Sequence, residues 1–300
     1  MFIAETKGCL LQAALFFIPL RFFLEGFRIH LKQHMFSFFI EYKSAQIHCL
    51  QWGNGKELLI CFHGFGENAA SFQYLATTLT EKYTVIAIDL PLHGQTVWDK
   101  EITCKPEDVL NVIYKLPGLE ERSFSLAGYS MGGRVALAVY QQIPQRVQQL
   151  ILLAPDGIKV NGWYWLATQT KMGNNLFRYC MKDPRLFFGV TGTLKSLGII
   201  NTGVYNYVQK HLQEPEMRSR LYAIWTLMRK IRPDIRAVQS LINIHQTRVV
   251  LLYGKYDHII RFATGERFKK EIDAFCHLHV LNCGHRMLHQ KNISAIAALL

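Results

Sequence analysis

Short apolar runs alternate with helical patterns along most of the chain. Eight runs predict strands at 36–42, 46–52, 57–62, 84–89, 123–127, 150–153, 248–253 and 277–281. The middle runs, such as ELLICF at 57–62, are continuously apolar, which is typical of parallel strands that are covered on both faces. Helical patterns lie between the runs at 69–81, 106–115, 132–142 and 262–274. The pattern therefore predicts an α/β fold, with a mostly parallel eight-stranded sheet and helices on both of its faces.

One interval breaks this alternation. Residues 157–241 separate the sixth and seventh predicted strands, and this is far more chain than a connecting loop contains. We expect the interval to form a helical cap, inserted into a body made of residues 35–156 and 242–300. Within it, apolar residues recur at helical spacing and predict an amphipathic helix that packs on the body: Met217, Leu221, Ile224, Trp225, Met228 and Ile231.

The first 34 residues precede the predicted sheet and match no standard targeting segment. The apolar stretch 9–24 is interrupted by Pro19 and Arg21, and it is shorter than the roughly 20 residues of a membrane-spanning helix. It also lacks the cleavage pattern of a secretory signal. We expect either a loosely ordered extension over 1–34 or a natural start at Met35. Loose membrane association through residues 9–24 is the less favoured alternative.

Composition and charge narrow the classes of function. A hydrophobic fraction of 50% with 19% charged residues indicates a globular chain. The net charge is +12, but its excess lies mainly within 157–241 and no nucleic-acid-binding motif accompanies it, so a nucleic-acid partner is not expected. The seven cysteines contain no C-x-x-C pair. They favour a reducing compartment, the cytoplasm, over a disulfide framework.

The sequence GYSMG at 128–132 joins a predicted strand to a predicted helix. This is the G-x-S-x-G motif in the context that it requires, because its glycines permit a sharp turn that raises the Ser130 hydroxyl above the sheet. A serine hydroxyl becomes a good nucleophile only beside a base that a carboxylate orients. Asp257 follows the seventh predicted strand and His285 follows the eighth, at the edge where such sheets place their sites. We predict Ser130 as nucleophile, His285 as base and Asp257 as acid.

Two further turns complete the predicted site. HGFG at 63–66 follows the third predicted strand, and the backbone N–H of Phe65 can form an oxyanion hole with that of Met131. Asp156 follows the sixth predicted strand and is the alternative acid. Alternatively, Asp156 is a turn residue or the N-cap of a helix at the point where the inserted segment 157–241 begins.

Together these motifs resemble the α/β-hydrolase superfamily, specifically its cap-bearing branch, over almost all of residues 35–300. DLPLHG at 89–94 is similar to the D-x-P-G-H-G loop of that superfamily and departs from it at Leu92. The resemblance implies the same nucleophile, base and acid, although some members carry the acid where Asp156 stands. Because Ser130 occupies the nucleophile position, the resemblance argues against haloalkane dehalogenase, epoxide hydrolase and dienelactone hydrolase chemistry.

The expected function is hydrolysis of a small-molecule carboxylic ester or thioester through an acyl-enzyme, without a cofactor. GYSMGGR at 128–134 also resembles the strand-to-helix turn around the serine, called the nucleophile elbow, in the menaquinone-pathway synthase that eliminates pyruvate. In that family an arginine in the position of Arg134 helps to bind the anionic substrate. A triad-dependent lyase is therefore the first alternative, and a non-catalytic binder with the same fold is the second.

Histidine and cysteine also crowd the C-terminal part of the chain and resemble a metal site. No second ligand pair with a recognised spacing completes four-coordination, so we expect no metal there. The crowded residues are Cys276, His277, His279, Cys283, His285 and His289. Other histidines, such as His48, His93 and His245, are expected to be packed or surface residues.

Overall fold

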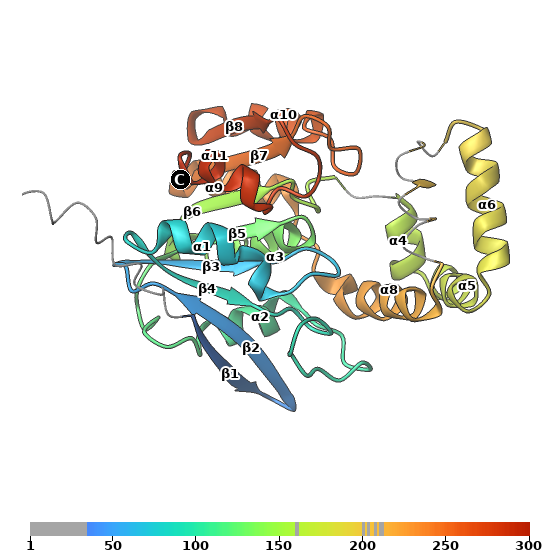
Figure 1. Ribbon diagram of the computed structural model, residues 1–300, viewed down its shortest axis with the longest axis horizontal. Helices are drawn as coiled ribbons and strands as arrows, with labels where there is room; N and C mark the ends of the chain where they lie inside the picture. Colours follow the sequence, from blue (N-terminus) through green and yellow to red (C-terminus); the bar gives the residue numbers. More distant parts are fainter. Residues whose placement is uncertain (1–34, 160–161, 200–201, 203–204, 207–208, 210–212) are drawn as a thin grey trace, which may run out of the picture. The chain divides into compact units, whose positions relative to one another are not determined.

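The computed structural model describes residues 35–159, 162–199, 202, 205–206, 209 and 213–300, and an eight-stranded sheet forms its centre (Figure 1). Its strands lie in the order β1-β2-β4-β3-β5-β6-β7-β8. β2 pairs antiparallel with β1 and β4, and the other neighbours pair in parallel. The predicted fold class is confirmed. The strands are β1 (Phe36–Tyr42), β2 (Ala45–Trp52), β3 (Glu57–Phe62), β4 (Tyr83–Ile88), β5 (Phe124–Tyr129), β6 (Val147–Leu153), β7 (Arg248–Gly254) and β8 (Cys276–Leu281).

Helices cover both faces of the sheet. Figure 1 shows α1 and α11 in front of it, in contact with each other, and the contacting pair α2 and α3 behind. α11 was not among the predicted elements. The body helices are α1 (Gln73–Leu79), α2 (Pro106–Ile113), α3 (Met131–Tyr140), α9 (Ile235–His245), α10 (Ala263–Lys270) and α11 (Gln290–Ala297), with short 3-10 helices η1 (Ala69–Phe72), η2 (Pro144–Arg146) and η4 (Asp273–Phe275).

The continuous apolar runs of the sequence form the core. Every residue of β5 is buried, as are the last five residues of β3 and the last six of β7. Two-sided burial of this kind explains why these strands show no alternation of apolar and polar residues. The thiols of the core are inert, since burial raises the pKa of Cys49 and of Cys276 to about 12.

Helices joined by short connections make up most of the described part of the interval between β6 and β7. Its helices are α4 (Gly162–Gln169), α5 (Lys171–Lys182), α6 (Pro184–Ser196), α8 (Pro215–Leu227) and η3 (Met228–Lys230). α8 and η3 occupy the predicted amphipathic helix, and Ile224, Met228 and Ile231 are buried against the main core. A separate small core joins Phe177, Met181 and Leu221.

Helix α9 crosses the expected boundary between cap and body at residue 241. Its Val238 and Ile242 belong to the core of the body, and the Gln239 side chain donates to the Phe268 carbonyl of α10. The division into body and cap stays a prediction. The predicted extension 1–34, with its apolar stretch 9–24, lies outside the described residues. Within the described part of the chain, no helix is both long and apolar enough to cross a membrane.

Candidate active site

The backbone turns sharply at Ser130, where β5 runs directly into α3. Ser130 has φ 51° and ψ −115°, a conformation that costs an ordinary residue free energy and persists because its surroundings fix it. A Cβ atom at Gly132 would collide with the Phe62 carbonyl, and one at Gly128 would collide with the backbone of α3. The Ser130 N–H donates to the Leu153 carbonyl of β6 at 2.9 Å. The turn therefore requires glycine at both flanking positions and presents the hydroxyl beyond the strand.

The three residues predicted to carry the chemistry lie together. His285 Nε2 is 3.0 Å from Ser130 Oγ, and His285 Nδ1 is 2.7 Å from Asp257 Oδ2. The other carboxylate oxygen, Oδ1, accepts the backbone N–H groups of Ile259 and Ile260 at 2.8 and 2.9 Å. These bonds fix the buried carboxylate, which can then hold the imidazole with Nε2 directed at the hydroxyl.

Tyr129, the last residue of β5, supports His285 from the position before Ser130. Its hydroxyl donates to the His285 carbonyl at 2.9 Å, and the two rings lie 5.5 Å apart. The variable residue before Ser130 in the motif thus ties the loop of His285 to the loop of Ser130. The motif predicts no role for this tyrosine, because it specifies only the residues beside it.

The HGFG turn lies against Ser130. A Cβ atom at Gly64 would be 3.4 Å from Ser130 Cβ and 3.1 Å from the Tyr129 ring, so only glycine fits without displacing them. Among the described residues, no acceptor takes a hydrogen bond from the backbone N–H of Phe65 or of Met131. Both predicted donors can therefore serve a ligand atom.

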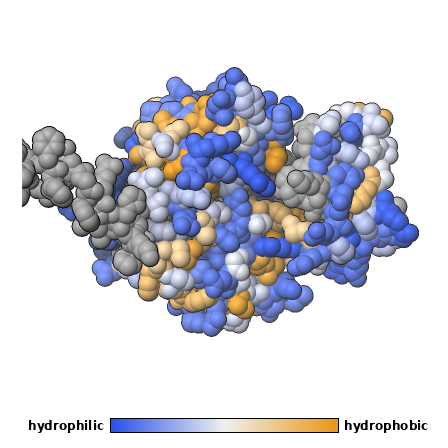
Figure 2. All heavy atoms as spheres, in the orientation of Figure 1, coloured by the Kyte–Doolittle hydropathy of each residue, from blue (hydrophilic) through white to orange (hydrophobic). Residues whose placement is uncertain are grey.

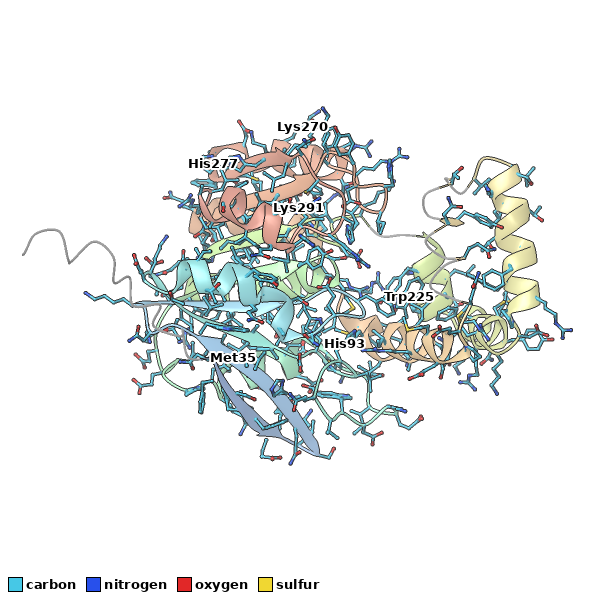
Figure 3. The ribbon with its side chains drawn as sticks, viewed as in Figure 1. Met35, His93, Trp225, Lys270, His277 and Lys291 are labelled. Carbon is cyan, nitrogen blue, oxygen red and sulfur yellow. The ribbon has the colours of Figure 1, made fainter. Side chains whose placement is uncertain are left out.

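Two buried histidines hold this turn to the loop after β4. His63 Nε2 accepts the Leu90 N–H at 3.0 Å, while its Nδ1 lies 2.8 Å from the Gly64 carbonyl. His93, labelled in Figure 3, accepts the Gly66 N–H on Nε2 at 3.2 Å. Burial lowers the pKa of His63 to about 4, and burial with the neighbouring His63 lowers that of His93 to about 3. Neutral rings can accept these bonds, so both are positioning residues that the sequence analysis missed.

The DLPLHG loop after β4 holds neighbouring segments of backbone in place. The Asp89 carboxylate accepts the backbone N–H groups of Ala69 and Gln95 at 2.6 and 2.8 Å. Leu92, the departure from the superfamily pattern, has φ 64°. This left-handed conformation favours glycine, which explains the residue that is usual there.

Arg134 and Asp156 contact each other, and Asp156 takes part in the turn that was the alternative interpretation of this residue. The Arg134 side chain is buried, with only 5% of the residue exposed, and its guanidinium lies 4.7 Å from the centre of the Tyr164 ring of α4. Arg134 Nε is 3.6 Å from Asp156 Oδ2, and Asp156 Oδ1 accepts the Gly157 N–H at 2.7 Å. Asp156 is thus a turn residue at the start of the interval 157–241, and it is Asp257 that contacts the histidine.

Glu67 is an ionisable residue that directly follows the HGFG turn and was not among the predicted site residues. Its Oε2 atom is buried and has no hydrogen-bond partner among the described residues. Burial raises the pKa of this carboxyl, while a hydrogen bond from Ser71 and the charges of His285 and Arg286 act in the opposite direction. No motif marks Glu67, because its burial depends on how the turn packs.

The crowded C-terminal residues do not assemble a metal site. Within the described residues, no group of three or more His, Cys, Asp or Glu side chains is arranged to hold a metal ion. His285 is engaged with Ser130 and Asp257, and His277 is exposed at the edge of the sheet, where Figure 3 labels it.

The observed fold and the strand-to-helix turn at Ser130 agree with a match between this chain and a known protein family. Residues 57–291 match the family described as alpha/beta hydrolase fold. The chain belongs to this family. A thioesterase domain from the curacin biosynthetic pathway has the same fold: its TM-score is 0.57 at 21% identity, with 89% of this chain and 98% of that one covered.

Curated relatives match shorter regions. The uncharacterized hydrolase YugF of Bacillus subtilis is 34% identical over 104 residues, which are 34% of this chain and 38% of YugF. A pimeloyl-[acyl-carrier protein] methyl ester esterase of Nitrosomonas europaea is 30% identical over 125 residues, 40% of this chain and 46% of the esterase. The matched region is thus less than half the length of either relative.

Proposed function

We propose that the protein is a serine hydrolase that cleaves a carboxylic ester or thioester of a small molecule. Ser130, His285 and Asp257 form the proposed triad. The observation that carries the proposal is the position of His285, within 3.0 Å of Ser130 Oγ and 2.7 Å of Asp257 Oδ2. Family membership and relatives that are named as a hydrolase and a methyl ester esterase support the same class of reaction.

In the acylation step, Ser130 Oγ attacks the acyl carbon as His285 Nε2 takes the hydroxyl proton. Asp257 stabilises the imidazolium that forms, because it accepts the Nδ1–H bond. The negative charge on the former carbonyl oxygen requires donors that are not already occupied, and the N–H groups of Phe65 and Met131 meet this requirement. His285 then returns the proton to the leaving alcohol or thiol, which leaves the acyl group on Ser130.

Deacylation repeats the same steps with water as the nucleophile. His285 takes a proton from water, the hydroxide attacks the ester of Ser130, and the proton passes to Ser130 Oγ as the acid product leaves. The geometry of the site must therefore persist over two half-reactions. Positioning of the HGFG turn by His63 and His93 serves this purpose, since neither ring gains a charge near neutral pH.

The lyase alternative depended on an arginine that binds an anionic substrate. Arg134 instead lies buried between Tyr164 and Asp156, where its charge already has a carboxylate neighbour. This arrangement favours ester or thioester hydrolysis. The non-catalytic alternative is weakened by the bonded alignment of all three side chains of the proposed triad.

The test combines active-site labelling with a substrate panel. A fluorophosphonate probe should modify the full chain at Ser130, and peptide mass spectrometry locates the adduct. Nitrophenyl esters and acyl thioesters of increasing chain length then measure turnover, with pyruvate release from the synthase substrate assayed in parallel. Labelling without hydrolysis of any ester or thioester would contradict the proposal, and pyruvate release in its place would favour the lyase.

A further inference from the structure

The outer side of helix α5 exposes a row of apolar side chains. Met172, Leu176 and Tyr179 follow one another at intervals of four and three residues, so they lie on one side of the helix. These residues are 80%, 58% and 53% exposed. Single exposed apolar residues are ordinary, but a contiguous row of large ones marks an interaction surface.

Only part of the apolar face of α5 packs inside the protein. Phe177 and Met181 are buried in the small core with Leu221 of α8, and they lie further round the helix than the exposed row. Gly173 holds α5 against α4, since a Cβ atom there would collide with the Leu166 carbonyl. α4 also exposes an aromatic side chain, Trp165.

Positive charge borders the exposed row. α5 carries Lys171, Arg178 and Lys182 and contains no acidic residue. Among the described residues, none of these three cations takes part in an ion pair. Apolar residues beside unpaired lysine and arginine are the pattern of a helix that lies in a membrane interface.

A polar cavity of about 350 Å³ opens beside the first turn of α5. Lys171, Arg229 and Lys230 line it together with hydroxyl and amide groups that include those of Thr168 and Asn175, and no acidic residue lines it. Within the described part of the chain, Arg229 and Lys230 likewise form no ion pair, although Arg229 is half-buried. The cavity therefore has the chemistry of a site for a phosphate group.

We propose that this face of α5 docks on the surface of an anionic bilayer. Met172, Leu176 and Tyr179 enter the headgroup region, and the cavity at Lys171 receives a headgroup phosphate. A second copy of this chain is a poorer occupant, because it would bring the same unpaired cations face to face. Figure 2 shows hydrophilic and hydrophobic residues mixed over the surface in view, so the distinguishing feature is the border of unpaired charge and not apolarity alone. The proposal is independent of the reaction at Ser130.

The test is co-sedimentation of the full chain with vesicles. We expect binding to phosphatidylcholine vesicles that contain about 30 mol% phosphatidylglycerol, weaker binding to pure phosphatidylcholine, and loss of binding when salt rises from about 0.1 to about 0.5 M. The double variant Lys171→Gln, Lys182→Gln should lower the partition coefficient about 25-fold, because each basic residue near such a surface contributes about fivefold. Met172→Ser with Leu176→Ser should lower it about tenfold or more.

Matched controls test whether the loss of any two lysines, or of any exposed apolar side chain, weakens vesicle binding equally. Lys270→Gln with Lys291→Gln removes two exposed lysines of the body, both labelled in Figure 3, and Ile244→Ser removes an exposed apolar residue of α9. Both controls should leave partitioning within about twofold, at a melting temperature matched to that of the α5 variants. Equal losses in the controls would overturn the proposal.

The segment 9–24 needs its own variant. Phe16→Asp with Phe17→Asp in the full chain should leave a component of binding that still depends on Lys171 and Lys182. If these N-terminal changes abolish binding while the α5 changes have no effect, the proposal is overturned. A change of oligomeric state in the α5 variants, measured by light scattering without a change in vesicle binding, would assign the face to self-association and would also overturn it.

Discussion

The described part of the chain contains a second Ser–His–Asp constellation, far from the proposed triad in the order of the sheet. We call Ser37 of β1, His48 of β2 and Asp89 after β4 the Ser37 cluster. Ser37 Oγ is 2.9 Å from His48 Nε2, and His48 Nδ1 is 2.7 Å from Asp89 Oδ2. These distances match those of the proposed triad to within 0.1 Å (3.0 and 2.7 Å). Hydrogen-bond distances alone therefore do not distinguish a catalytic site from a structural one.

The Ser37 cluster and the proposed triad differ in the backbone around the serine. Ser37 lies within a regular antiparallel ladder opposite Leu50, whereas Ser130 lies at φ 51° on the first turn of a helix. The helix N-terminus and the HGFG turn place unoccupied N–H groups beside Ser130, and a strand offers no such pair. Access differs as well: the His48 side chain is 3% exposed and that of His285 is 18% exposed. A base must exchange protons with substrate and water, so His48 suits stability and His285 suits catalysis.

The largest expected effect tests which serine reacts. Ser130→Ala should lower turnover about a million-fold, because the nucleophile and its base act as one unit. Ser37→Ala should leave turnover within about twofold, since it removes a hydroxyl that only caps His48. Ester hydrolysis and fluorophosphonate labelling measure both. Retention of the label in Ser130→Ala, with its loss in Ser37→Ala, would reverse the comparison.

The second prediction compares the carboxylates. Asp257→Asn should lower turnover about ten-thousand-fold by favouring the wrong tautomer of His285. Asp156→Asn, the matched control, should change turnover little, because Asp156 contacts Arg134 and the side chain is 41% exposed. Steady-state kinetics at a matched folded fraction provides the measurement. A severe loss in Asp156→Asn beside a mild one in Asp257→Asn would move the acid to the end of β6.

The third prediction concerns the carboxylate of the Ser37 cluster. Asp89→Asn should lower the free energy of unfolding by about 3 kcal/mol, because Asp89 accepts two backbone N–H groups and His48 in a buried site and the amide cannot accept all of them. Its turnover per folded molecule should fall far less than that of Asp257→Asn. Urea unfolding measures the stability. An Asp89→Asn protein that melts like the wild type and has lost turnover would give this cluster a catalytic role.

The sequence predicted most of the fold and the residues that lie together at the candidate site, for a physical reason. Strands that are buried on both faces need continuous apolar runs, and a nucleophile elbow needs glycine at 128 and 132, so both leave local signals. Of the eight predicted strands, the greatest difference is at β6, which begins at Val147 and not at 150. The extra residues include Gln149, a buried polar side chain that hydrophobicity does not reveal.

Residues whose roles depend on distant packing could not be predicted. His63 and His93 occur in recognisable motifs, but their shared task of holding the HGFG turn requires two loops that only the fold brings together. The Ser37 cluster draws on β1, β2 and the end of β4, which are neighbours in the sheet but are not consecutive along the chain, so no local spacing marks it. Arg134 was assigned to substrate by resemblance, while its stacking on Tyr164 depends on the placement of α4.

The fourth prediction tests whether Arg134 resembles the Ser37 cluster in being structural. Arg134→Ala should lower the free energy of unfolding by about 2 kcal/mol, since it removes a cation and a buried aliphatic stem from the Tyr164 ring. It should change KM alike for neutral and carboxylate-bearing esters. Arg134→Lys, which keeps the charge and loses the planar stack, is the control. A KM increase confined to carboxylate-bearing substrates would make Arg134 an anion-binding residue and would revive the lyase alternative.

The smallest expected effect comes from a carboxyl beside the proposed triad. Both carboxylate oxygens of Asp89 have hydrogen-bond partners, whereas Glu67 Oε2 is buried and has none in the described part of the chain. Burial raises the Glu67 pKa. The folded state therefore holds a proton on Glu67 at pH values where the unfolded chain has released it. The free energy of unfolding must then fall as pH rises from the pKa of Glu67 in the unfolded chain through its pKa in the folded protein.

Glu67→Gln removes this loss and should stabilise the protein by about 1 kcal/mol above that pH interval, with little effect below it. Thermal melts from acid to neutral pH measure the difference, with Glu81→Gln, an exposed carboxyl, as the control. If Glu67→Gln is instead destabilising at neutral pH, the ionised carboxylate is the form that supports the turn, and its charge then acts on His285.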